Sequence, residues 1–131
     1  MEELFKIGIS ENTIKNMLEI NPNLKELTTK EIKEKIEILK QINCSDTQII
    51  NIISSNAIYL DRTNTEIIDL IKYLISLRFT TLNILFDSNP YILNLEIFEI
   101  ENYITERKNK GELLEDIIDD LDTNPYLFTE I

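Results

Sequence analysis

The chain has 131 residues, of which 43% are apolar and 28% charged, a composition typical of a soluble globular protein. It has no histidine, one cysteine and two glycines. These counts exclude an intramolecular disulfide, a thiol nucleophile activated by histidine and a glycine-rich phosphate loop. The net charge is −11, and it is concentrated in residues 111–131, which carry seven acids and no base.

Nothing in the sequence marks export or membrane insertion. The first ten residues lack both the basic and the apolar stretch of a secretory signal. Charged residues such as Asp69 and Lys72 interrupt the longest apolar runs, so no segment predicts a membrane span. The single thiol fits a reducing compartment. We therefore expect a cytoplasmic protein in which Cys44 is a partly buried apolar residue.

A turn containing asparagine and proline recurs along the chain. Its copies are Asn21-Pro22, Asn89-Pro90, Asn124-Pro125 and a degenerate Asn56-Ala57, at spacings of 33 to 35 residues. A fixed period in this range is typical of helical repeat proteins. The sequence predicts an all-α superhelical solenoid of about 3.5 helix-turn-helix repeats, in a single domain over residues 1–131. We expect repeats at 8–42, 43–77 and 78–110 and an acidic half-repeat at 111–131 that caps the array.

The first repeat shows the two predicted helices most completely. Residues 4–8 resemble the last turn of a helix, and a first helix follows from the cap Ser10 to the turn at Pro22. It ends there because a residue before proline is pushed out of the helical region. A second helix begins at a capping box of Thr28 and Glu31, and its apolar stripe is Ile32, Ile36 and Leu39.

The second repeat follows the same pattern. Both of its helices are predicted to begin with capping boxes, Ser45 with Gln48 and Thr63 with Glu66. The apolar stripe of its second helix is Ile67, Ile71 and Leu74.

The third repeat and the half-repeat depart from the pattern of the first two repeats. The second helix of the third repeat is expected to begin at Glu96, and its stripe ends in Arg107 where the earlier repeats have leucine. We therefore expect this helix to end more exposed. The half-repeat has no polar cap, but Glu112 and Glu115 are expected in its first turn, where acids interact favourably with the helix dipole.

Residues that tolerate a left-handed backbone stand at the joints between repeats. Gly8, Asn43 and Gly111 each lie fourteen residues before a turn, and glycine and asparagine commonly adopt positive φ at helix ends. The third repeat lacks two residues in this region and has Leu77-Arg78-Phe79 instead. We expect the joint between the second and third repeats to be irregular.

This arrangement resembles the repeat of the mitochondrial transcription termination factor (mTERF) family. The likeness is carried by Gly8-Ile9-Ser10, Ile14, Leu18, Asn21-Pro22, Leu24, Ile32, Ile36 and Leu39, and in weaker form by the other repeats. The resemblance implies a curved superhelix of two-helix repeats, each with a short turn of the 3₁₀ type. It also implies a groove, basic in many family members, that binds nucleic acid.

Lysines of the first repeat are the candidate nucleic-acid patch, since affinity for phosphates comes largely from Lys and Arg. They are Lys15, Lys25, Lys30, Lys33 and Lys40. Glu31, Glu34 and Glu37 interleave with them. The alternative is therefore a solvated, salt-bridged helix face.

A candidate surface for a protein partner combines two tyrosines with three acids: Tyr91, Tyr126, Glu115, Asp119 and Asp122. The tyrosines follow the turn prolines and would anchor a partner if exposed; the alternative is that they pack between adjacent turns. The acidic run lacks the glycine and alternating oxygen ligands of a calcium loop. We interpret it as a capping face or as a surface for a basic partner.

The sequence contains no catalytic, metal-binding or cofactor-binding motif. We expect a non-catalytic binding scaffold without a cofactor, and a monomer or weak end-to-end dimer. A protein partner is the leading hypothesis, because the chain is strongly acidic. Nucleic acid, DNA or RNA bound through the groove and the first repeat, is the alternative.

Overall fold

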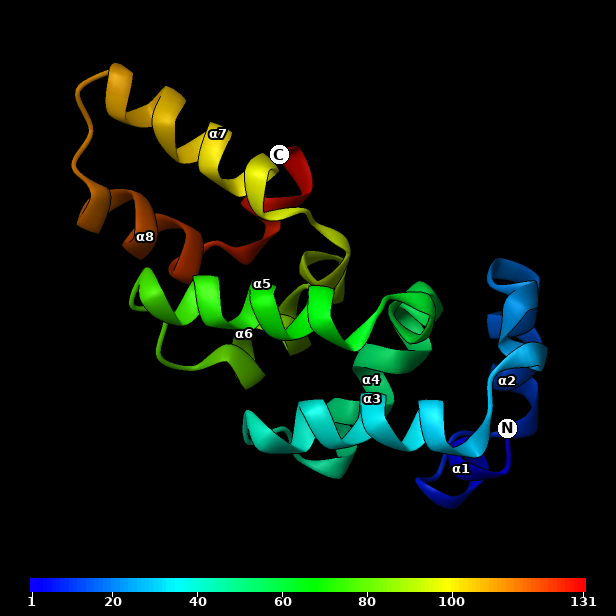
Figure 1. Ribbon diagram of the computed structural model, residues 1–131. Coiled ribbons are helices and arrows are strands. Elements are labelled where there is room, and N and C mark those ends of the chain that lie inside the picture. The colour runs from blue at the N-terminus through cyan, green and yellow to red at the C-terminus, as the bar shows by residue number, and fades with distance from the viewer.

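Figure 1 shows the computed structural model, which describes all 131 residues and contains only helices and their connections. The α-helices are α1 (Glu2–Lys6), α2 (Glu11–Ile20), α3 (Thr29–Gln41), α4 (Asp46–Ser55), α5 (Asn64–Ser76), α6 (Leu82–Ser88), α7 (Ile97–Asn109) and α8 (Leu114–Thr123). The 3₁₀ helices are η1 (Pro22–Glu26), η2 (Ala57–Asp61), η3 (Pro90–Asn94) and η4 (Pro125–Glu130). A membrane-spanning helix, which would need more length and more apolar residues than these helices have, is not present.

Each repeat consists of a first helix, a 3₁₀ helix and a second helix. In Figure 1 the second helices α3, α5 and α7 follow one another from the N-terminal to the C-terminal end of the array. The first helices α2, α4 and α6 pack on one another in order, and each 3₁₀ helix contacts the next. The prediction of an all-α helical-repeat solenoid is confirmed.

The predicted apolar stripes form the core. A continuous cluster of 33 buried residues extends from Leu4 to Phe128. The stripes on α3 and α5 are buried along their whole length, and Ile100 and Ile104 are buried on α7. Side chains three or four residues apart share one helix face, so each second helix turns a single apolar face to its neighbours. Each buried Ile or Leu contributes about 1.5–3 kcal/mol relative to an exposed one.

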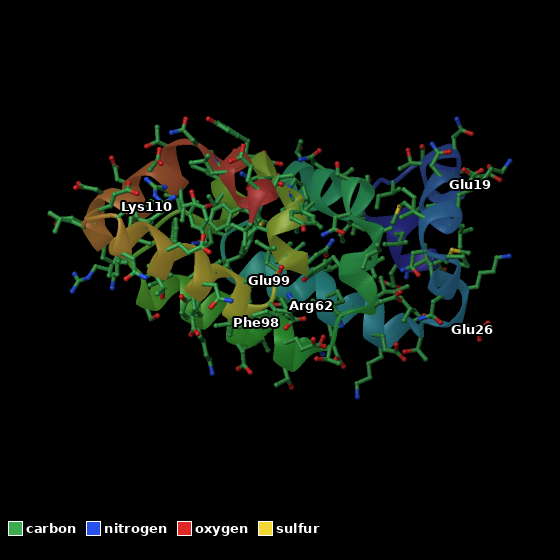
Figure 2. The ribbon with its side chains drawn as sticks, turned by 90° about the horizontal axis from the view of Figure 1, so that it is seen from above. Glu19, Glu26, Arg62, Phe98, Glu99 and Lys110 are labelled. Carbon is green, nitrogen blue, oxygen red and sulfur yellow. The ribbon has the colours of Figure 1, made fainter.

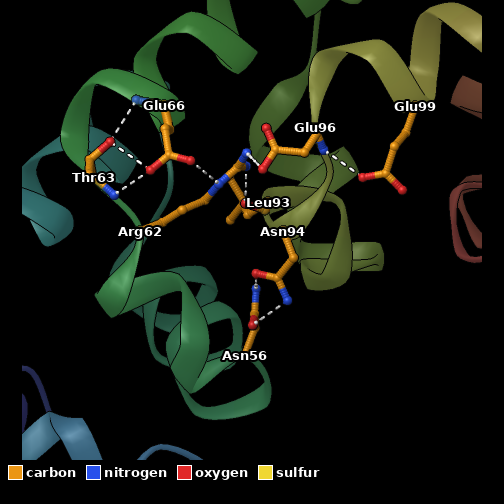
Figure 3. Close-up of polar contacts among 8 residues, drawn as sticks. All are labelled: Asn56, Arg62, Thr63, Glu66, Leu93, Asn94, Glu96 and Glu99. Atoms are coloured by element: carbon orange, nitrogen blue, oxygen red, sulfur yellow. Dashed lines mark hydrogen bonds and ion pairs between the residues drawn. The ribbon is translucent and has the colours of Figure 1, made fainter.

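Reciprocal capping boxes form at two of the predicted helix starts. The hydroxyl of Thr63 accepts from the backbone N–H of Glu66 at 3.2 Å, and the carboxylate of Glu66 accepts from the backbone N–H of Thr63 at 3.3 Å (Figure 3). Ser45 and Gln48 make the equivalent pair at the start of α4. These boxes satisfy N–H groups that a helix start otherwise leaves without partners.

Two other predicted helix starts need correction. The box at Thr28 is only half formed, because the carboxylate of Glu31 accepts from the Thr28 hydroxyl and not from its backbone N–H. At the acidic half-repeat, α8 has no side-chain cap, as predicted. However, Glu112 lies before this helix and not in its first turn, where Glu115 and Asp116 stand.

The joints before the four first helices share one hydrogen-bond pattern. The backbone N–H of Ile9 donates to the carbonyl of Leu4 at 3.1 Å. The same bond recurs from Cys44 to Leu39, from Phe79 to Leu74 and from Glu112 to Arg107. The residue before each donor has positive φ, namely Gly8, Asn43, Arg78 and Gly111. This is the Schellman motif, in which a left-handed residue reverses the chain and satisfies the last carbonyls of a helix.

The prediction of an irregular third joint is confirmed in part. Its Schellman bond is regular, and Arg78 has a φ of 78°, close to the 71° of Asn43. However, α6 begins four residues after Arg78, whereas α2, α4 and α8 begin three residues after their left-handed residue. The following helix also differs. Helix α6 has 7 residues, whereas α2, α4 and α8 have 10 each. At a rise of about 1.5 Å per residue, α6 is shorter than its equivalents by roughly 4.5 Å.

A ladder of asparagine side chains joins each turn to the next. The side-chain amide of Asn21 donates to the backbone carbonyl of Ala57 at 3.1 Å. The equivalent bonds run from Asn56 to Pro90 and from Asn89 to Pro125, both at 2.9 Å. We call Asn21, Asn56 and Asn89 the asparagine ladder. Asn124 instead donates to the carboxylate of Asp120 in its own helix.

The contact between the second and third repeats has further polar bonds (Figure 3). Asn56 and Asn94 exchange two amide hydrogen bonds of 2.9 and 3.0 Å. The guanidinium of Arg62 donates to the carbonyl of Leu93 at 2.7 Å and forms an ion pair with Glu96 at 3.2 Å. The side chain of Arg62 is only 11% exposed, so these bonds form at a largely covered site.

Replacing Asn56 with alanine should lower the free energy of unfolding by about 1–3 kcal/mol, because it removes the bond to the Pro90 carbonyl and both bonds to the Asn94 side chain at a nearly buried site. Urea unfolding followed by circular dichroism measures the change. Asn23→Ala is the matched control, since its bond to Asp61 also links two repeats but is exposed; we expect a change within about 0.5 kcal/mol. Equal losses in both variants would contradict a structural role for the ladder.

Replacing Gly111 with alanine should destabilise the last joint by about 1 kcal/mol. Gly111 has a φ of 95°, and an added Cβ would meet no atom within 4 Å, so the cost comes from the backbone alone. Arg78→Gly relieves the same strain at the third joint and should raise the free energy of unfolding by a similar amount. Thermal unfolding compares the two variants; a loss of stability in Arg78→Gly would contradict this account.

Candidate binding surfaces

The lysines of the candidate nucleic-acid patch are exposed but do not form one basic surface. Lys15 lies on α2, Lys25 on η1, and Lys30, Lys33 and Lys40 on α3. Lys30 forms an ion pair with Glu34 at 3.8 Å. Only Lys33 and Lys40 share a hollow, between α1 and α3, and three acids line it with them: Glu3, Glu34 and Glu37. Figure 2 shows further acids, Glu19 and Glu26, at the same end of the molecule.

Lys35 departs from the solvated helix face that the sequence indicates for α3. It is 5% exposed, and its ammonium donates to the side-chain oxygen of Asn64 at 2.6 Å. Asn64 in turn donates to Glu34. Burial lowers the pKa of Lys35, and the nearby carboxylates, chiefly Glu34, partly oppose this effect. Lys35 therefore links α3 to α5 and is not available to a ligand.

A hollow of about 690 Å³ lies between the end of α5 and the side of α8, and we call it the α8 hollow. Its lining residues are Leu77, Arg78, Leu113, Leu114, Glu115, Ile118, Asp119 and Asp122. The structure thus brings together the three acids of the candidate partner surface. Leu113 is 61% exposed and Leu114 is 38% exposed, so apolar surface lies beside these acids.

Helices α6 and α8 begin and pack differently. Helix α8 begins three residues after its left-handed joint residue, Gly111, whereas α6 begins four residues after Arg78. Helix α6 packs on α4 and η4, while α8 packs on α7 (Figure 1). The end of α5, at Leu77 and Arg78, faces the side of α8 across the hollow, and no residue of α6 lines it.

The acids of the α8 hollow are unpaired. Glu115, Asp119 and Asp122 lie four and three residues apart, which places them on one face of α8. None of them forms an ion pair within 4.0 Å, and neither does Arg78, the one base that lines the hollow. The hollow therefore presents excess negative charge beside exposed leucines.

Arg107 holds α8 in place. Its guanidinium donates to Glu112 at 2.9 and 2.5 Å and forms an ion pair with Asp120 at 2.8 Å. It also donates to the hydroxyl of Tyr103 at 3.0 Å. The side chain of Arg107 is 16% exposed, whereas its equivalents Leu39 and Leu74 are fully buried. No residue of α7 after Ile104 is buried, so this helix ends more exposed than α3 and α5, as predicted.

The ion pair between Arg107 and Glu112 stands where the other joints have two apolar residues. Arg107 occupies the position of Leu39 and Leu74, and Glu112 occupies that of Cys44 and Phe79. A hydrophobic contact between these two positions commonly accompanies a Schellman motif. The hydrogen bonds from Arg107 hold the pKa of Glu112 below the ordinary carboxyl value, and Glu112 in turn raises the pKa of Arg107.

A row of exposed apolar side chains lies along the 3₁₀ helices. Ile58, Tyr91 and Tyr126 stand second in η2, η3 and η4, and they are 48%, 42% and 63% exposed. The interpretation that the tyrosines pack between turns is therefore wrong. Tyr91 shares a small hollow with Ile20 and Ile58, whereas Tyr126 does not line it, and neither tyrosine lines the α8 hollow.

The remaining sequence candidates show no reactive site. Cys44 is 8% exposed, and burial, with a smaller effect of Asp87, raises the pKa of its thiol to about 11. A thiol with such a pKa is a poor nucleophile near neutral pH. The acids of α8 do not converge on a point where a metal ion would bind.

The fold defines a helical-repeat protein whose unit is two α-helices separated by a 3₁₀ turn. The mTERF family model matches residues 1–104, and the chain belongs to the mTERF family, as its repeats predict. The family is one of non-enzymatic helical-repeat scaffolds. The match ends within α7, so Arg107 and α8 lie beyond it. A comparison with curated proteins found no match.

The double variant Arg107→Leu/Glu112→Ile should keep α8 folded, because it restores the apolar contact of the other joints. In the parent chain the pKa of Glu112 is lowered by folding. Its stabilising effect is therefore complete above the ordinary carboxyl pKa and is lost as the pH falls through the lowered value. Thermal unfolding between about pH 3 and 7 should show a smaller loss of stability at low pH in the double variant.

Glu112→Ile alone serves as the control for this pair. It leaves Arg107 with Asp120 as its one carboxylate partner, so we expect it to be less stable at neutral pH than either the parent or the double variant. The same pH dependence in the parent and the double variant would contradict a contribution from the Arg107–Glu112 pair.

Proposed function

We propose that this chain is a non-catalytic scaffold that binds a protein partner. Family membership makes it a helical-repeat scaffold. The observation that carries the choice of partner is the contrast between two surfaces. Unpaired acids and exposed leucines meet in the α8 hollow, whereas the lysines of the first repeat are interleaved with acids.

The exposed apolar side chains support a protein partner. Leu113, Tyr91 and Tyr126 are 61%, 42% and 63% exposed, although the chain has a large continuous core in which side chains of these types are commonly buried. Protein interfaces combine apolar or aromatic anchors with a polar rim. The α8 hollow has both kinds of side chain within one surface.

The absence of an activated nucleophile supports a role in binding and not in catalysis. Cys44 is buried with a raised pKa, and the chain has no histidine to act as its base.

Nucleic acid is the second candidate, because five exposed lysines lie within the first repeat and helical-repeat scaffolds of this family commonly bind nucleic acid. The net charge of −11 opposes this function, since phosphates would be repelled by the acidic residues 111–131 and find no excess of basic residues elsewhere.

Fluorescence anisotropy with short labelled duplex and single-stranded DNA and RNA tests the choice between these candidates. We expect no binding between about 50 and 200 mM salt, because the lysines are offset by neighbouring acids. Binding that weakens steeply as salt increases, and that Lys33→Glu/Lys40→Glu abolishes, would overturn the preference for a protein partner. Lys72→Glu/Lys108→Glu, on α5 and α7, makes the same change in net charge away from the first repeat and is the control.

A further inference from the structure

We infer that the α8 hollow binds a short, basic amphipathic helix of a partner protein. The inference rests on the proposed function and adds to it the site and the chemistry of the partner. The site is formed by the end of α5 and the exposed side of α8, and the partner presents lysines or arginines beside leucine-like side chains.

The apolar half of the site is formed by leucines that the fold leaves in water. Leu113 and Leu114 are 61% and 38% exposed, and Ile118 lies one turn further along α8 with 8% exposure. Leu77, at the end of α5, lines the opposite side. A partner side chain placed between them would remove apolar surface from water on both sides, which is the main source of favourable free energy in association.

The acidic half of the site lies beside these leucines. Glu115, Asp119 and Asp122 form a row on the same helix and have no basic partner within the chain. By contrast, Asp120 is paired with Arg107. The unpaired carboxylates are therefore free to form ion pairs with a ligand, and charge complementarity selects a basic one.

The spacing of the lining residues favours a helical ligand. Leu114 and Ile118 lie four residues apart, and the acidic row from Glu115 to Asp122 spans two turns, or roughly 10 Å. A helix that lies along α8 would present apolar and basic side chains at the same three- and four-residue spacings. Amphipathic helices bind grooves in this way.

Fluorescence anisotropy with the full-length chain tests this inference. The probe is a labelled amphipathic peptide of leucines and lysines, about four turns long, at near-physiological salt of about 150 mM. A peptide with glutamate in place of lysine and a lysine peptide without leucines are the comparison ligands. We expect the leucine-lysine peptide to bind at least about tenfold more tightly than either of them.

Matched variants locate the binding site. Asp119→Lys/Asp122→Lys should weaken binding about tenfold or more, whereas Glu101→Lys/Glu106→Lys, which makes the same charge change on exposed positions of α7, should alter it less than about threefold. Leu113→Ser should also weaken binding. It stands at the N-cap of α8, where serine is favourable, so the helix is retained.

Phe98→Ser is the control for Leu113→Ser, because both side chains are 61% exposed. Figure 2 shows Phe98 near the start of α7, away from Lys110 beyond its other end, where the chain turns towards α8. Equal effects of the hollow variants and their controls, or no binding of the leucine-lysine peptide, would overturn the inference. The proposed function is tested separately by the nucleic-acid titration, so the two can fail independently.

Discussion

The side chain of one asparagine in each repeat reaches the backbone of the next turn, and the stacking of the repeats depends on this bond. Asn21, Asn56 and Asn89 each donate to the first carbonyl of the following 3₁₀ helix at 2.9–3.1 Å. Asparagine suits the position because its short side chain carries N–H donors, which aspartate lacks. The bond joins one turn to the next, where successive 3₁₀ helices are in contact. The buried faces of the helices then meet in one continuous core.

The joint before each first helix tolerates changes in sequence as long as its backbone geometry is kept. Glycine, asparagine and arginine all occupy the left-handed position, with φ between 71° and 108°. At the last joint, Arg107 and Glu112 replace the apolar pair of the other joints. The motif is preserved by its backbone hydrogen bonds, and the side chains that accompany it vary. Because the backbone bonds suffice, the third repeat and the half-repeat can carry different surface side chains and keep the same fold.

That different surface connects the fold to the proposed function. It lies in the α8 hollow, between the end of α5 and the side of α8. Arg107 forms ion pairs with Glu112 and Asp120 and so holds α8 in place. Glu115, Asp119 and Asp122 are unpaired and line the α8 hollow. The acidic end of the chain therefore contains carboxylates that hold the helix and carboxylates that line the α8 hollow. Net charge alone does not reveal this division.

The amino-acid sequence by itself determined the repeat period, the helix pairs, their buried stripes and most helix starts, because these depend on local spacing and on capping residues such as Ser45 and Thr63. It also indicated the family and the acidic candidate surface. The tertiary structure decided which polar residues link repeats, such as Lys35 and Arg107, because a side chain that reaches another repeat leaves no local pattern. It also decided that Arg78 keeps the Schellman motif at the third joint and that Tyr91 and Tyr126 stay exposed. The asparagine ladder had one sequence signal: Asn56 is retained where the neighbouring proline is lost, which a role in ending the helix alone does not require.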